Sequence, residues 1–382
     1  MSRLFLIISF LMVFSCKEKP VSEKKTLAIE KSNILEGLTI SVDTIMVDAG
    51  EELITYGIPY ISTLSPEARY FYILDNKTFK IHQIDLDSLA FIDSFFIEKE
   101  GPNSPGFTFM FQPISEDQFF FPSFQSPSII NASGEKIRSW NLNLPDIIDG
   151  FSVDLNSLTN RIVFNSTMDQ LYSLPVNYET REYYLAVLNS YGKRKRIIAL
   201  PEFNKANAFT IRTGGGEGGG LKIEFPYLQH LNDEVIISCT VGNGIYRYDP
   251  SLDSISYREF PLKIVPLEKK GEIKNRVHSN EEFEVEVKKI ATQISHWNFI
   301  WDEASQLYFR FASRVFSHRT EYKESKMEIF LMVFSKDLEL VGETRLEGLT
   351  NVPHSGFFKE GKLWSNVNVA DELGFSVIDF QF

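Results

Sequence analysis

Short apolar runs, rich in aromatic and β-branched residues, alternate with polar turns along most of the chain. The first unit has runs at residues 70–75, 79–85 and 91–95. Polar turns recur near residues 88, 133, 191, 251 and 336. Runs this short, bounded by Asp, Ser, Asn and Gly, predict β-strands. Because each unit has enough strands for a small antiparallel sheet, the repeat is typical of β-propeller blades.

Six such units fit the chain between residues 38 and 382, and the last one is incomplete. It supplies only three strands, the final one at Phe375–Phe380, whereas a spare strand lies at Leu38–Asp48. Pairing the two would remove an exposed sheet edge. We therefore predict an all-β fold, a six-bladed β-propeller closed by pairing the N-terminal strand with the last blade. A β-sandwich, which needs two packed sheets and no repeat, is the alternative.

One segment before the fifth unit departs from the strand pattern. Ser279-Asn-Glu-Glu282 is a capping box, which predicts the start of a helix. The apolar residues that share one face of this helix are Phe283, Val287, Ile290 and Ile294. We predict an inserted surface helix at about residues 280–294 that packs over the edge of the ring. A lid or a partner-binding helix is the alternative.

The N-terminus has the pattern of an export signal. Arg3 precedes the apolar run Leu4–Phe14, which is about half the length needed to cross a bilayer. We interpret residues 1–15 as a signal peptide and residues 16–37, rich in Lys, Glu and Ser, as a flexible tether. Residues 38–382 then form a single domain, because no Pro- or Ser-rich linker divides them.

The end of this signal, Val13-Phe14-Ser15-Cys16, resembles a bacterial lipobox. The resemblance implies that Cys16 is lipidated and begins the mature chain, and two or more acyl chains give stable anchoring. Lys17 and Glu18 resemble the start of the surface-export signal of Bacteroidota lipoproteins, although Lys19 interrupts the acidic run. The implied location is the outer membrane, at the cell surface or on the periplasmic face. An ordinary signal peptide followed by a chance cysteine is the alternative.

Charge and cysteine content narrow the set of partners. The chain has 51 acidic and 39 basic residues, a formal net charge of −12. Such a charge repels polyanions, so we exclude nucleic acid as a partner. Lipidation would use Cys16, and Cys239 lies in an apolar strand-like run where we expect it to be buried. No intramolecular disulfide is then available, so the fold depends on its core.

No motif predicts a cofactor or a metal site. The glycine-rich stretch at residues 211–220 lacks the following helix that a nucleotide-binding loop requires, so we interpret it as a mobile loop. The six histidines show no i, i+4 pair for metal binding, and no G-x-S-x-G sequence indicates an α/β-hydrolase. We therefore predict no cofactor.

Three segments carry a family resemblance: Lys99-Glu-Gly-Pro-Asn103, Tyr308-Phe-Arg-Phe311 and Pro353-His-Ser-Gly-Phe357. Through them, residues 38–382 resemble a family of Bacteroidota lipoproteins of unknown function that is related to the TolB-like six-bladed propellers. The resemblance implies a propeller body attached to the outer membrane. The family supplies no activity to carry over.

Four residues are candidates for ligand binding at the mouth of the propeller channel: Arg310, His354, Arg212 and His230. Arg310 lies within an aromatic strand, where its guanidinium could bind a carboxylate or a sugar acid through two hydrogen bonds. The alternative is an ion pair with an Asp or Glu of a neighbouring blade. We assign no catalytic residue.

Three Asp-Ser/Thr-aliphatic triplets resemble the O-glycosylation sites of exported Bacteroidota proteins. Their hydroxyl residues are Thr44, Ser88 and Ser254. The alternative is that these residues are ordinary polar turn residues.

The function predicted from the sequence is a lipid-anchored propeller that acts as a binding or scaffold module. Its ligand would be a glycan, a peptide or another envelope protein, because a ring of repeats presents loops for binding. The alternative is a propeller hydrolase or lyase that acts on sugars or lactones with a metal at the channel mouth. A purely structural envelope protein without a concave pocket is the third interpretation.

Overall fold

The structure is a computed structural model that describes most of the chain from residue 33 onward. The described residues are 33–52, 54, 61–106, 110–123, 126–142, 147, 157–177, 180–214, 219–224, 226–317, 326–353, 355–370 and 372–382. Residues 32–382 form one compact unit. The predicted signal peptide, Cys16 and His354 lie outside the described residues. None of the described helices has the length and apolar character needed to cross a membrane.

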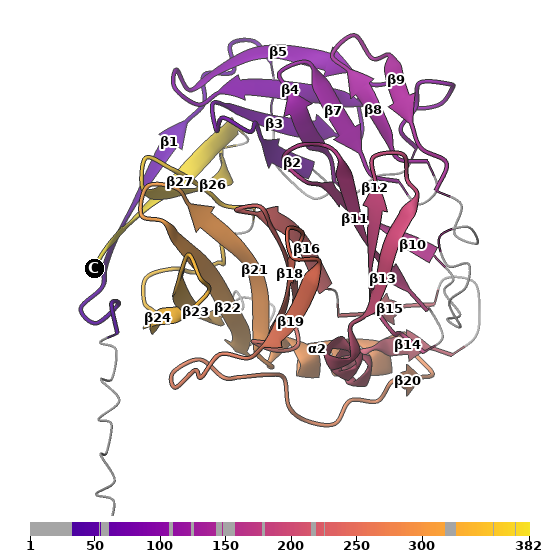
Figure 1. Cartoon of the computed structure of the whole chain (residues 1–382). Helices are drawn as coiled ribbons and strands as arrows, with labels where there is room; N and C mark the ends of the chain where they lie inside the picture. The colour runs from indigo at the N-terminus through magenta and orange to yellow at the C-terminus, as the bar shows by residue number, and fades with distance from the viewer. Residues whose placement is uncertain are drawn as a thin grey trace, which may run out of the picture. The chain divides into compact units, whose positions relative to one another are not determined.

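Four-stranded antiparallel sheets follow one another along this unit, which confirms the all-β prediction (Figure 1). Sheet 1 contains β2 (Ile61–Leu64), β3 (Tyr70–Asp75), β4 (Lys80–Asp85) and β5 (Ala90–Phe96). Sheet 2 contains β6 (Gln112–Ser115), β7 (Gln118–Phe121), β8 (Ser128–Asn131) and β9 (Lys136–Ser139). Sheet 3 contains β10 (Ser157–Phe164), β11 (Gln170–Val176), β12 (Tyr184–Asn189) and β13 (Arg194–Ala199).

Two further sheets of the same kind follow. Sheet 4 contains β16 (Pro226–Leu231), β17 (Glu234–Cys239), β18 (Ile245–Asp249) and β19 (Ser254–Arg258). Sheet 5 contains β21 (Ser295–Asp302), β22 (Leu307–Ser317), β23 (Lys326–Ser335) and β24 (Leu340–Leu346). In each sheet the strands are hydrogen-bonded in chain order, as expected for successive antiparallel connections.

Sheet 6 joins the two ends of the described chain. It contains β25 (Phe357–Lys359), β26 (Lys362–Val369), β27 (Glu372–Gln381) and, at its edge, β1 (Thr39–Met46). β1 runs antiparallel to β27, with Thr39 opposite Gln381 and Met46 opposite Gly374. The expected pairing of the N-terminal strand is therefore present, and it covers an edge that β27 would otherwise expose.

Alternate side chains of one strand enter different hydrophobic cores, so the sheets bury both faces. In β3, Phe71 and Ile73 belong to one cluster, whereas Tyr72 and Leu74 belong to another. Six such clusters each combine residues of two consecutive sheets. One of them packs Phe375 of β27 against Phe71 of sheet 1, with ring centroids 5.1 Å apart. Burial on both faces explains why the inner strands are continuously apolar.

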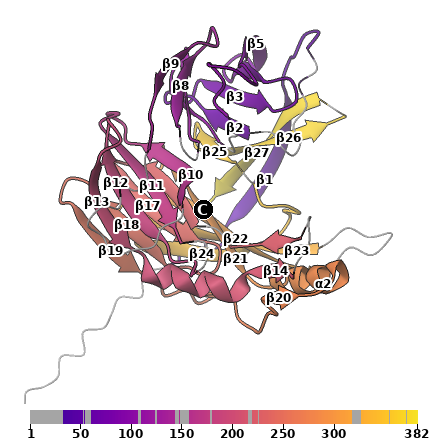
Figure 2. The same cartoon turned by 90° about the vertical axis from the view of Figure 1, so that its right-hand side faces the viewer.

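Two insertions between sheets form a small additional structure, which we call the cap. The first contains the 3-10 helix η1 (Pro201–Phe209), β14 (Ile211–Thr213) and β15 (Leu221–Lys222). The second contains β20 (Arg276–Val277) and α2 (Asn280–Ala291). β14 pairs antiparallel with β15 and parallel with β20, and α2 packs on β14 and β20 (Figure 2). The cap is therefore built from two insertions, one before sheet 4 and one before sheet 5.

Helix α2 confirms the predicted helix, although it ends at Ala291 rather than at about residue 294. Ser279 is its N-cap, because the Ser279 hydroxyl accepts a hydrogen bond from Glu282 N at 3.2 Å. Gly220, at the end of the glycine-rich stretch, lies against this helix: a Cβ on Gly220 would come within 3.0 Å of the Phe283 ring. Glycine at position 220 therefore permits the close approach.

The domain begins earlier than the predicted residue 38. Asn33 Nδ2 donates a hydrogen bond to Glu343 O at 2.8 Å, and Asn33 Oδ1 accepts one from Glu343 N at 3.0 Å. Leu35 is 2% exposed and belongs to the core between sheets 5 and 6. Residues 33–37 are therefore part of the domain rather than of the tether. A single leucine in a polar segment carries no periodic signal, which is why the sequence placed the boundary too late.

We predict that Leu35→Ala lowers the free energy of unfolding by about 2–4 kcal/mol, because it leaves a cavity in a packed core. Urea unfolding of a soluble form that lacks the signal and Cys16 measures the change. Leu252→Ala is the control, since Leu252 is 73% exposed and its truncation should cost less than about 0.5 kcal/mol. An unchanged unfolding midpoint for Leu35→Ala would return residues 33–37 to the tether.

Candidate functional site

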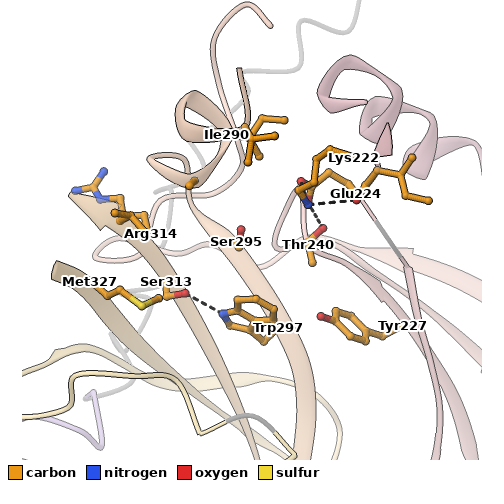
Figure 3. A pocket seen from close by; sticks show the side chains of 14 residues that line it. Lys222, Glu224, Tyr227, Thr240, Ile290, Ser295, Trp297, Ser313, Arg314 and Met327 are labelled. Atoms are coloured by element: carbon orange, nitrogen blue, oxygen red, sulfur yellow. Dashed lines mark hydrogen bonds and ion pairs between the residues drawn. The ribbon is translucent and has the colours of Figure 1, made fainter. Parts of the chain in front are cut away.

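A cavity of about 300 Å³ lies beneath the cap, between sheets 4 and 5 (Figure 3). We call it the cap cavity. Helix α2 forms its roof, and the first residues of β16 and β21 form its floor. The lining residues are Lys222, Ile223, Glu224, Tyr227, Thr240, Val287, Ile290, Ala291, Ser295, Trp297, Ser313, Arg314, Val315 and Met327.

Two aromatic rings form the floor of the cap cavity. Tyr227 comes from β16 and Trp297 from β21, and Figure 3 shows both side chains below Ile290 of α2. Trp297 Nε1 donates a hydrogen bond to Ser313 Oγ at 3.0 Å, which holds the indole in place. Burial raises the pKa of Tyr227 to about 12, so its hydroxyl is protonated at neutral pH. Among the described residues this hydroxyl has no hydrogen-bond partner, so it can donate to a ligand.

One wall of the cap cavity carries a buried ionic group centred on Glu224, whose side chain is 3% exposed. Lys222 Nζ lies 3.3 Å from one carboxylate oxygen, and Lys269 Nζ lies 3.7 Å from the other. Thr240 Oγ1 donates a hydrogen bond to the same carboxylate. Lys269 also donates to Ser295 Oγ at 2.7 Å, so the group reaches the cavity lining. Burial lowers the pKa of Lys269, and the Glu224 carboxylate opposes that shift.

The opposite wall carries a second ionic group. Arg314 Nε donates to Glu328 Oε2 at 2.6 Å, and Arg345 Nη1 lies 3.0 Å from Glu328 Oε1. Each ionic group therefore has two cationic side chains for one carboxylate, and Lys222, Glu224 and Arg314 are the members that line the cavity. Above them, α2 contributes apolar atoms from Val287 and Ile290.

Arg310, a candidate from the sequence, is fully buried beside this floor. Its Nε donates to Trp297 O at 2.7 Å, and its Nη1 donates to Asn243 O at 2.6 Å. Its Nη2 lies 3.4 Å from Gly242 O and 3.5 Å from Cys239 O. Burial lowers the pKa of Arg310 to about 9, which leaves it charged at neutral pH. The alternative of an ion pair is wrong, because the partners of Arg310 are carbonyl oxygens: Trp297 O in β21, and the Cys239, Gly242 and Asn243 oxygens at and beyond the end of β17.

The structure does not bring the sequence candidates together. His230, on β16, stacks against Tyr172 of sheet 3 with ring centroids 6.2 Å apart, and burial lowers the pKa of His230. Arg212, on β14 of the cap, is exposed. None of Arg212, His230 and Arg310 lines the cap cavity, and His354 lies outside the described residues. Ligand binding by these four residues stays a prediction.

No pattern in the sequence predicts the charged group at Glu224. Lys222 and Glu224 follow the glycine-rich stretch, whereas Lys269 belongs to the other insertion. The only local signal is a Lys-Ile-Glu alternation, which any half-exposed strand shares.

Other sequence predictions concern single residues. The predicted O-glycosylation residues Thr44, Ser88 and Ser254 are all exposed. Cys239 is buried with a free thiol, as expected, and burial raises its pKa. In the part of the chain that the structure describes, no three His, Cys, Asp or Glu side chains are grouped as metal ligands.

A wider cavity, of about 930 Å³, lies at the other ends of β16 and β21. Two of its acidic side chains are bound within their own turn. Asp302 accepts hydrogen bonds from Ala304 N and Ser305 N, and Glu303 accepts one from Trp301 Nε1. The cap cavity is the stronger candidate, because its lining combines the Tyr227 hydroxyl, which has no hydrogen-bond partner among the described residues, with the cationic side chains of Lys222 and Arg314.

Consecutive four-stranded antiparallel sheets that share cores with their neighbours define an all-β protein with β-propeller-like architecture. A family model described as "Domain of unknown function (DUF4221)" matches residues 31–345. The chain belongs to this family. No curated protein matches the sequence.

Two solved structures show the likeness of fold. A member of the DUF4221 family from Bacteroides vulgatus superposes with a TM-score of 0.64 at 15% identity, over 90% of this chain and 98% of that chain. A candidate exported protein from Bacteroides fragilis superposes with a TM-score of 0.51 at 10% identity, over 92% of this chain and 97% of that chain. Neither description names a ligand or a reaction.

We predict that Arg310→Met lowers the free energy of unfolding by at least about 3 kcal/mol, because several buried carbonyl oxygens lose their donor. Urea unfolding followed by tryptophan fluorescence measures the change. The control is Arg345→Met, whose side chain is 54% exposed and whose ion pair should contribute less than about 1 kcal/mol. Equal effects of the two substitutions would contradict a structural role for the Arg310 contacts.

Proposed function

We propose that this chain is a six-bladed, closed β-propeller that acts as a binding module, with one sugar unit of an envelope glycan as the ligand of the cap cavity. The observation that carries the proposal is the pairing of two aromatic rings with several hydroxyl groups in one small cavity. The β1–β27 pairing and the core shared by sheets 1 and 6 support the closed ring.

The size of the cap cavity supports a small occupant. About 300 Å³ is at the lower end of the range for small-molecule sites. A single sugar ring fits this volume, whereas a folded partner protein does not enter it. The end of a peptide is the competing occupant of the same space.

The chemistry of the lining supports a sugar over an apolar ligand. Sugar rings present C–H faces that pack on aromatic side chains and hydroxyl groups that need hydrogen-bond partners. Tyr227 and Trp297 supply the rings, and the hydroxyls of Tyr227, Ser295 and Ser313 lie in the same lining. The Glu224 carboxylate adds an acceptor.

The lipobox-like sequence before Cys16 supports attachment to the outer membrane. The similar fold of an exported-protein candidate from Bacteroides fragilis fits an exported body. Under this proposal the lipid holds the propeller at the envelope, where glycans are present. The exposed residues Thr44, Ser88 and Ser254 remain proposed sites of O-glycosylation.

We predict that Tyr227→Phe weakens binding of a monosaccharide ligand about five- to tenfold, because it removes one hydrogen bond. Isothermal titration of the soluble form with a panel of neutral and acidic monosaccharides measures the affinity. Tyr191→Phe is the control, since Tyr191 is 78% exposed and distant in sequence from every lining residue. Unchanged affinity in Tyr227→Phe, or turnover of a sugar, would count against a binding module that uses this cavity.

We also predict that Cys16→Ser releases the protein from the membrane fraction, because the anchor depends on acylation of that thiol. Metabolic labelling with a palmitate analogue, followed by fractionation, measures both the modification and the location. Cys239→Ser is the matched control and should remain labelled. A Cys16→Ser protein that stays labelled and membrane-bound would exclude lipidation at this residue.

A further inference from the structure

We infer that the cap cavity selects an acidic sugar and that Lys222 binds its carboxylate. This inference rests on the proposed function, since it names the class of sugar that the same cavity takes. It starts from a contrast in charge: the chain as a whole is acidic, with a formal net charge of −12, whereas the charged residues that line this cavity are two cations, Lys222 and Arg314, and one anion, Glu224.

The ionic groups of the two walls give the balance. The cations are Lys222, Lys269, Arg314 and Arg345, and the carboxylates are Glu224 and Glu328. Arg161 and Arg310 add positive charge near the Tyr227 hydroxyl. On α2, Glu286 and Lys289 pair with each other at 2.6 Å, so this pair adds no net charge to the roof. A partly enclosed site with this balance concentrates anions.

Lys222 is the cation of the Glu224 group that a ligand can reach. Its side chain is 38% exposed, whereas the side chain of Lys269 is 1% exposed. Lys222 Nζ lies 3.3 Å from Glu224 Oε1 and 3.3 Å from Ile223 O. Because an ammonium group has three donor hydrogens, one remains for a ligand carboxylate.

The Glu224 carboxylate does not cancel this preference. The Oε2 atom of Glu224 lies near the Lys269 ammonium group and accepts a hydrogen bond from the Thr240 hydroxyl. The Oε1 atom forms an ion pair with Lys222. Lys222, Lys269 and Glu224 together carry a net charge of +1. Lys222 is the cation of this group that is exposed to a ligand. A lysine acts as a point charge, so it accepts a carboxylate whose orientation is set by ring packing on Trp297.

The test compares uronic acids with the neutral sugars of the same configuration. We expect the soluble protein to bind glucuronate or galacturonate at least about tenfold more tightly than glucose or galactose, because a hydrogen bond to a charged group is stronger than a neutral one. Isothermal titration at low ionic strength measures both affinities. The preference should decrease as salt is added, since Lys222 is partly exposed.

Substitutions at Lys222 assign the preference to this residue. Lys222→Gln should weaken uronate binding about tenfold and change neutral-sugar binding less than threefold, whereas Lys222→Arg should keep the preference. Lys193→Gln is the control for the loss of one charge, because Lys193 is exposed in the β12–β13 turn. Both sugars should bind this variant as they bind the wild type.

The outcomes distinguish failure of the acidic-sugar inference from failure of the glycan-binding proposal. Equal binding of neutral and acidic sugars overturns the acidic-sugar inference and leaves the glycan-binding proposal in place. A preference that survives in Lys222→Gln overturns the role of Lys222. Binding of no sugar, acidic or neutral, overturns the proposed function together with the inference.

Discussion

Burial of both faces of each sheet is the constraint on which the rest of this protein depends. A small four-stranded sheet with apolar side chains on both faces is not stable alone, so each sheet needs neighbours on two sides. Phe119 and Phe120, adjacent in β7, show this directly. Phe119 packs edge-on against Tyr72 of sheet 1 at 5.1 Å, and Phe120 packs against Phe164 of sheet 3 at 4.7 Å. β1 adds a fourth strand to sheet 6 by pairing with β27, and Phe375 of β27 packs against Phe71 of sheet 1.

The contact between sheets 4 and 5 shows how this packing produces a site. β17 ends at Cys239, and the carbonyl oxygens of Gly242 and Asn243 then lie outside the strand ladder. Arg310 of sheet 5 reaches these oxygens and also binds Trp297 O. Burying a guanidinium costs free energy of desolvation, which its hydrogen bonds to carbonyls offset. The same contacts therefore join two sheets and position the floor of the cap cavity.

The fold could be predicted further from the sequence than the site, for a physical reason. Strands such as 70–75 and the capping box at Ser279 are specified by neighbouring residues, so their patterns are local. The partners of Arg310 are backbone carbonyls, one from its own sheet and the others from the end of β17 and the residues after it, and a carbonyl has no sequence signature. Leu35 is a single leucine in a polar segment, and its burial depends on contacts with sheet 5, such as that of Asn33 with Glu343, which are about 310 residues away in the chain. The charged lining of the cavity likewise depends on contacts between two insertions.

The cap cavity is formed by residues of both insertions, which are far apart in the sequence. The first supplies Lys222 and Glu224, and the second supplies Lys269 and the roof helix α2. Their backbones meet in the parallel pairing of β14 with β20, and their charges meet where Lys269 lies 3.7 Å from Glu224. Glu224 is thus the one carboxylate that contacts cations from both insertions, Lys222 at 3.3 Å and Lys269 at 3.7 Å. A ligand carboxylate at Lys222, as proposed, would therefore compete with Glu224 for Lys222 and leave Glu224 more closely paired with Lys269.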